Sequence, residues 1–110
     1  MGVEFQLHRG SVHLARGFNQ IQKAGNSLAD EHYDRAVTHL DKALTEFGDA
    51  SNNFAKAEDD ACAKAGAQID KGNDELSKSV KEYGAGDYDS AASHLAKAQE
   101  NYDNALDLVG

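Results

Sequence analysis

The chain contains no proline and no tryptophan, and it has one cysteine among its 110 residues. Without proline, no residue interrupts a helix by lacking its backbone N–H. The single cysteine, Cys62, excludes an internal disulfide framework and suits a reducing compartment, so we expect a cytoplasmic protein. Residues 1–6 lack the apolar run of a signal peptide, although an exported chain with its leader removed would read the same way. No segment approaches the roughly 18 continuous apolar residues of a membrane span.

Large apolar side chains and clustered positive charges are also scarce. Leu, Ile, Val and Phe together number 20, and the net charge is -8. This composition lies near that of disordered chains, and it predicts a thin core for one domain spanning 1–110. No dense run of Lys or Arg is present, so we expect no nucleic-acid partner and no anionic membrane partner, because phosphate binding needs a clustered positive field. A second copy of the chain would bury more apolar surface, which predicts a homodimer.

The chain does have a regular helical period. Eighteen alanines favour helix, and apolar residues recur at alternating steps of four and three in four stretches: Leu7–Leu28, Tyr33–Phe54, Ile69–Tyr83 and Tyr88–Val109. This spacing packs helices at shallow angles in left-handed bundles. The sequence therefore predicts an all-α fold, an antiparallel up-and-down four-helix bundle.

One segment of the sequence occurs twice. Tyr33–Ala43 returns 55 residues later as Tyr88–Ala98, with seven of eleven positions identical. The same offset pairs Gly17 with Gly72. The repeat predicts two duplicated helical hairpins, covering about 11–54 and 66–109. Leu40 and Leu95 are expected at equivalent, buried positions.

The connections between the helices are less evenly marked. Gly84 is suited to the left-handed residue after a helix, and Asp87 to capping the next one. Asp30 is the expected cap in the first hairpin. The middle region, 48–74, stays open between a turn and one very long helix, and the long helix would require a dimer, for example a domain-swapped one. Three positions there offer a turn: Gly48–Ser51, Gly66 and Gly72–Asp74.

Two histidines, His39 and His94, occupy the same place in the two repeats. The segment His39–Ala43, with Lys42 one turn after the histidine, resembles the phosphorylation motif of histidine phosphotransfer domains, which are acidic four-helix bundles. The resemblance implies a signalling domain that uses His39 or His94. The segment departs from the motif in having Ala43 where Gly is usual and a leucine directly after the histidine. We favour the alternative that both histidines flank the apolar seam and were duplicated with the hairpin.

No other constellation predicts a catalytic, cofactor or metal site. Carboxylate-bridged di-metal bundles need Glu-x-x-His pairs, and none is present. His32 and His39 lie two turns apart, and the spacing of His8 and His13 points them in different directions. Cys62 lies among alanines, as expected for a small buried residue in a helix crossing rather than a nucleophile.

The repeated segments also have the appearance of known helical hairpins. Gly86–Ala91 and Tyr33–Ala36 resemble the second helix of a tetratricopeptide repeat and the Tyr-x-x-Ala helix of microtubule-interacting and trafficking domains. The period is 55 residues rather than about 34. The resemblance implies a protein-binding helical module. We therefore expect a non-catalytic interaction or adaptor protein with a protein partner, and the alternatives are phosphotransfer and small-ligand carriage.

Overall fold

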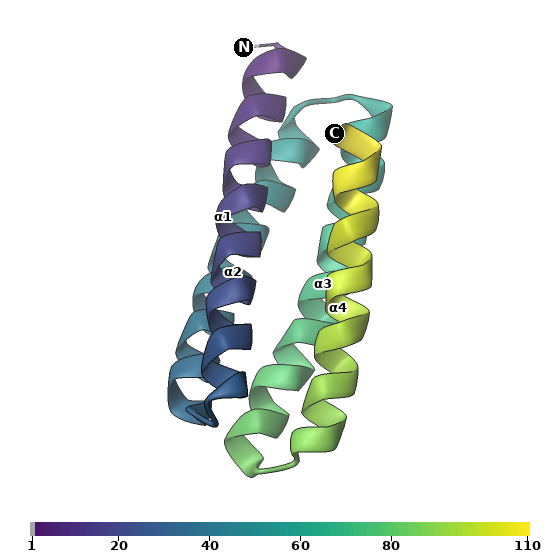
Figure 1. Ribbon diagram of the computed structural model, residues 1–110. Helices are drawn as coiled ribbons and strands as arrows, with labels where there is room; N and C mark the ends of the chain where they lie inside the picture. Colours follow the sequence, from purple (N-terminus) through teal and green to yellow (C-terminus); the bar gives the residue numbers. More distant parts are fainter. Residues whose placement is uncertain (1) are drawn as a thin grey trace.

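The computed structural model describes residues 2–110, which form four antiparallel helices joined by short turns. The helices are α1 (Val3–Ala29), α2 (Tyr33–Lys56), α3 (Asp60–Ala85) and α4 (Tyr88–Val109). They run alternately up and down in a rod whose Cα atoms span 44 × 18 × 18 Å (Figure 1). The predicted all-α, up-and-down four-helix bundle is confirmed. None of the four helices is both long and apolar enough to cross a lipid bilayer.

Within the rod, the helices pack as two hairpins. α1 packs closely on α2, α3 packs closely on α4, and α2 and α3 hold the two hairpins together, whereas α1 and α4 barely touch. Small residues bring α2 and α3 together: the Ser51 hydroxyl donates to Asp70 Oδ1 at 2.7 Å, and Gly66 lies against Ser51. Cross-hairpin packing is therefore concentrated on one side of the bundle.

The centre of the core is a pair of stacked rings. Phe47 on α2 and Tyr102 on α4 have ring centroids 3.6 Å apart and an interplanar angle of 16°. Each ring also rests on a glycine of its own hairpin, Phe47 on Gly17 and Tyr102 on Gly72. A Cβ added at Gly72 would lie 2.5 Å from Tyr102 Cε1, closer than non-bonded carbon atoms approach. These two glycines are therefore packing residues, and neither ends a helix.

Burial follows the 55-residue offset of the repeat. Leu40 and Leu95 are both buried, as expected. Nine further pairs at this offset are buried in both hairpins: Gly10/Ala65, Leu14/Ile69, Gly17/Gly72, Ile21/Leu76, Ala24/Ser79, Ala36/Ala91, Ala43/Ala98, Phe47/Tyr102 and Ala50/Ala105. The two hairpins therefore present matching apolar faces, while their origin by duplication stays a prediction.

The turns that close the two hairpins share one backbone pattern. Gly86 has φ of 83° and the equivalent Glu31 has φ of 60°, so both occupy the left-handed region. The next N–H bonds back into its helix in each case, His32 to the Ser27 carbonyl at 2.8 Å and Asp87 to the Glu82 carbonyl at 2.9 Å. The prediction of Gly84 as the left-handed residue was wrong, because α3 continues to Ala85.

The predicted helix caps differ from the observed ones. Asp30 ends α1, so it does not cap α2, and His32 occupies the position before that helix. Asp87 stands at the predicted place before α4, but its side chain makes no capping hydrogen bond. In both hairpins the backbone bonds of the left-handed turn close the connection instead.

The middle connection lies at residues 57–59, outside all three predicted positions. Glu58 has φ of 54°, and Asp59 Oδ2 accepts a hydrogen bond from the Cys62 N–H at 3.1 Å, which caps α3. Gly48–Ser51 lies inside α2, whereas Gly66 and Gly72–Asp74 lie inside α3. The alternative of one very long helix is therefore wrong, and so is its requirement for an exchanged dimer.

Candidate functional site

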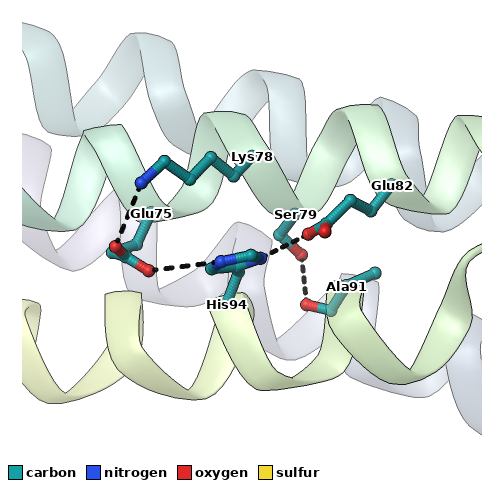
Figure 2. Close-up of polar contacts among 6 residues, drawn as sticks. All are labelled: Glu75, Lys78, Ser79, Glu82, Ala91 and His94. Atoms are coloured by element: carbon teal, nitrogen blue, oxygen red, sulfur yellow. Dashed lines mark hydrogen bonds and ion pairs between the residues drawn. The ribbon is translucent and has the colours of Figure 1, made fainter.

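His94 lies between two glutamates on the face where α3 meets α4 (Figure 2). Its Nδ1 is hydrogen-bonded to the Glu82 carboxylate, and its Nε2 lies 4.0 Å from Glu75 Oε2. The second Glu75 oxygen, Oε1, is 3.6 Å from the Lys78 ammonium. The His94 ring is one-quarter exposed, and Glu75 and Lys78 line an open hollow of about 410 Å³.

The environment of His94 bears directly on phosphotransfer. Glu75 Oε2 is buried and has no hydrogen-bond partner among residues 2–110. A phosphoryl group on either ring nitrogen would bring negative charge against a carboxylate, Glu82 on one side and Glu75 on the other. The arrangement suits a histidine that links two helices, and it opposes one that accepts phosphate.

His39 holds the matching position in the first hairpin with a neutral partner. Its Nδ1 donates to Gln20 Oε1 at 2.8 Å, and the ring is half-buried. Gln20 is the counterpart of Glu75 at the 55-residue offset, so an amide stands where the second hairpin has a carboxylate. The two histidines lie on different hairpins and make no hydrogen bond to each other.

These histidines belong to a set of polar pairs along the hairpins, here called the interhelical ladder. Its pairs recur at seven-residue intervals on both helices: Gln6–Asn53, His13–Glu46 and Gln20–His39 in the first hairpin, with Gln68–Asn101 and Glu75–His94 in the second. A seven-residue interval returns to the same side of a helix, so each pair lies at the edge of the apolar seam. The ladder fixes the register of each hairpin.

One pair of the interhelical ladder, together with a neighbouring aspartate, forms a group of three possible metal ligands that was not predicted from the sequence: His13, Glu46 and Asp49. His13 Nδ1 lies 2.9 Å from Glu46 Oε1, and Asp49 follows one turn after Glu46 on α2. One ligand atom from each of the three residues lies within 4.8 Å of the others. Along α1 itself, the nearest histidine to His13 is His8, which points in a different direction. Pairing α1 with α2 in antiparallel heptad register would have found Glu46.

Cys62 is buried at the start of α3 and is not poised for nucleophilic chemistry. Burial raises the pKa of its thiol, and hydrogen bonding to Asp59 and the negative charge of that residue raise the pKa further. A thiol with a raised pKa stays protonated at neutral pH, and the thiolate is the reactive form. The structural role expected for Cys62 therefore fits its surroundings.

Aromatic residues close the end of the rod that carries the hairpin turns. Tyr33 and Tyr88 stack with ring centroids 4.0 Å apart, and Tyr83 stacks against Tyr33. Beside them is an open hollow of about 440 Å³ whose walls also include Glu31 and Arg35. Its lining carries both acidic and basic side chains, with Asp34 and Glu31 beside Arg35.

The opposite end of the rod exposes apolar side chains. Four large hydrophobic residues there are between 39% and 44% exposed, and we call them the terminal patch: Val3, Phe5, Leu106 and Leu108. Two lie in the first turn of α1 and two in the last turn of α4, and both helix ends lie at the same end of the rod (Figure 1). The Arg9 guanidinium lies 5.7 Å from the centre of the Phe5 ring. These side chains leave apolar surface uncovered at this end of the rod, which is typical of a contact site.

Comparison with known proteins finds no matching family model, no similar curated protein and no similar solved structure. The short resemblance to tetratricopeptide and microtubule-interacting helices is therefore not extended by any longer match.

Proposed function

We propose that the protein is a non-catalytic helical interaction module that self-associates through the terminal patch. The observation that carries this proposal is the exposure of Val3, Phe5, Leu106 and Leu108 on two helix ends that lie at the same end of the rod. In water these side chains leave apolar surface uncovered, and association would remove it without ordering more backbone. A reducing compartment, the cytoplasm, fits a buried free Cys62.

The charges of the helices favour a second copy of the chain as the partner. α1 carries three Lys or Arg residues and one Glu, whereas α4 carries one Lys and four Asp or Glu. In a two-fold dimer, α1 of each copy would face α4 of the other, so both contacts would pair a basic helix with an acidic one. The apolar patch spans these same two helices.

The test is the oligomeric state of the full chain at tens of micromolar, measured by sedimentation equilibrium. We expect a dimer for the unmodified protein and a monomer for the double variant Phe5→Glu/Leu106→Glu, because two buried, unpaired carboxylates would oppose the contact. Ala96→Glu, at an exposed position on α4, adds a charge outside the patch and should leave the dimer intact. An unmodified protein that sediments at 11.8 kDa contradicts self-association, and a double variant that still dimerises contradicts the patch.

The alternative function is phosphotransfer. His39 suits it better than His94, because His39 bonds to a neutral glutamine and His94 lies between two carboxylates. Treatment with acetyl phosphate followed by intact-mass measurement at alkaline pH separates the two proposals. We expect no acid-labile phosphate. A phosphate addition that disappears in His39→Gln or in His94→Gln would favour the signalling function.

A further inference from the structure

We propose that His13, Glu46 and Asp49 bind a divalent transition-metal ion of the zinc class between α1 and α2. One imidazole nitrogen and two carboxylate oxygens form a ligand set that zinc accepts, and water would complete the coordination. The three ligand atoms lie within 4.8 Å of one another. Bonds to zinc of about 2.1 Å in a tetrahedral arrangement place ligand atoms about 3.4 Å apart, so side-chain rotation alone would close the site.

Burial and helix geometry partly organise this group before any ion binds. The side chains of His13 and Glu46 are 17% and 22% exposed, and they already touch across the hairpin at 2.9 Å. Asp49 is exposed and makes no hydrogen bond or ion pair within residues 2–110, so its carboxylate is free to turn toward an ion. Two rigid helices therefore supply the ligands, and no loop has to be ordered.

The second hairpin shows what these positions need for packing alone. At the 55-residue offset, His13, Glu46 and Asp49 correspond to three amides, Gln68, Asn101 and Asn104. Gln68 and Asn101 make the same contact between helices, with Asn101 Nδ2 donating to Gln68 Oε1 at 3.1 Å. Neutral side chains thus satisfy the ladder at this rung. The contact between the helices therefore does not require the imidazole and the two carboxylates of the first hairpin. Binding of a metal ion would account for these side chains.

Neighbouring positive charges set a limit on the affinity. Arg9 from α1 and Lys56 from α2 line the same hollow as His13 and Asp49. Both side chains are long and flexible, so they can swing into solvent, but they repel a divalent ion. Replacing either by Gln is expected to tighten metal binding.

The experiment is a calorimetric titration of Zn²⁺ into the full chain and into two variants that exchange the hairpins' side chains. His13→Gln/Glu46→Asn/Asp49→Asn gives the first hairpin the amides of the second, and circular dichroism checks that it folds. Gln68→His/Asn101→Glu/Asn104→Asp transfers the three ligands to the second hairpin. We expect one bound ion for the unmodified protein, none for the amide variant and two for the transfer variant.

A control separates this site from binding by any surface histidine. His8 is exposed on α1 and lies outside the group. His8→Gln should therefore bind one ion with an affinity within about threefold of the unmodified protein, a difference of about 0.6 kcal/mol in binding free energy. A flat titration of the unmodified protein overturns the proposal. So does equal binding by a folded amide variant, and so does a folded transfer variant that gains no second ion, because the helix geometry would then not suffice to build the site.

Discussion

At the scale of single residues, the helical glycines of this chain differ in whether packing requires them. Gly10 and Gly17 in α1, and Gly72 in α3, lie directly under aromatic rings of the partner helix, so a methyl group has no space there. A Cβ added at Gly25 in α1 would meet no other atom within 4 Å, so the missing side chain at this position serves no packing purpose. The same residue type is therefore required at some positions and replaceable at another.

This contrast predicts opposite effects of one substitution. Gly72→Ala should lower the free energy of unfolding by about 1 to 3 kcal/mol, because the Tyr102 ring must move away from the new methyl group. Gly25→Ala should raise it by up to about 1 kcal/mol through better helix propensity. Urea unfolding followed by circular dichroism measures both changes. Equal effects of the two substitutions would contradict the close packing of Tyr102 on Gly72.

At the scale of the elements, the number of helices and their seam could be predicted, whereas the turns could not. The four-and-three spacing depends only on the period of a helix, and Leu40 and Leu95 are buried where that period places them. The turns depend on left-handed residues, and two of these are Glu31 and Glu58, which nothing in the sequence distinguishes from other glutamates. Of the glycines that were expected to form turns, Gly66 and Gly72 pack against a neighbouring helix. Gly48 and Gly84 lie inside helices, and a Cβ added there would meet no other atom within 4 Å.

The same limit applied to the candidate site. His13 is unremarkable along its own helix, and its partner Glu46 lies 33 residues away. Only the register between two antiparallel helices brings the pair together, and that register depends on where the turn falls. A comparison of histidines within single helices therefore predicted no metal site. The heptad spacing of α1 and α2 nevertheless contained the information needed to pair His13 with Glu46.

The two hairpin turns provide a test at this scale. Glu31 adopts the left-handed conformation that Gly86 adopts at the equivalent position, and a side chain with a Cβ is strained there. Glu31→Gly should therefore raise the free energy of unfolding by about 1 kcal/mol, and Gly86→Ala should lower it by about the same amount. Thermal and urea unfolding measure both. A destabilising Glu31→Gly would show that the glutamate makes a stabilising contact that outweighs its backbone strain.

At the scale of the whole molecule, the stacked pair of Phe47 and Tyr102 joins the two hairpins across the core. Tyr102 is fully buried, and its hydroxyl donates to Asn73 Oδ1 at 2.7 Å. Burial raises the pKa of this phenol above its ordinary value. The ring therefore contributes to stability only as the neutral phenol, which links the stability of the bundle to alkaline pH.

The sign of this dependence follows from where the proton is held more tightly. The unfolded chain releases the Tyr102 proton near pH 10, while the folded chain retains it, so the contribution is complete below pH 10 and is lost as the pH rises toward the folded pKa. Unfolding free energies should fall above pH 10, by up to about 1.4 kcal/mol per pH unit for this one group. Tyr102→Phe should make that decline shallower. It should not abolish it, because burial also raises the pKa of Tyr83.

The turn at residues 57–59 lies at the same end of the rod as the start of α1 and the end of α4 (Figure 1). Each hairpin is thus complete before the chain passes to the other, and the passage can be cut without cutting a hairpin. A circular permutant that begins at Asp59, joins Gly110 to Gly2 through a flexible linker and ends at Glu58 would keep buried Ala57, the Asp59 cap of α3 and the packing within and between the hairpins. The linker would have to be longer than the three-residue turn it replaces, because α1 and α4 lie farther apart than α2 and α3. The order in which the two hairpins are synthesised is therefore not fixed by the packing of the bundle.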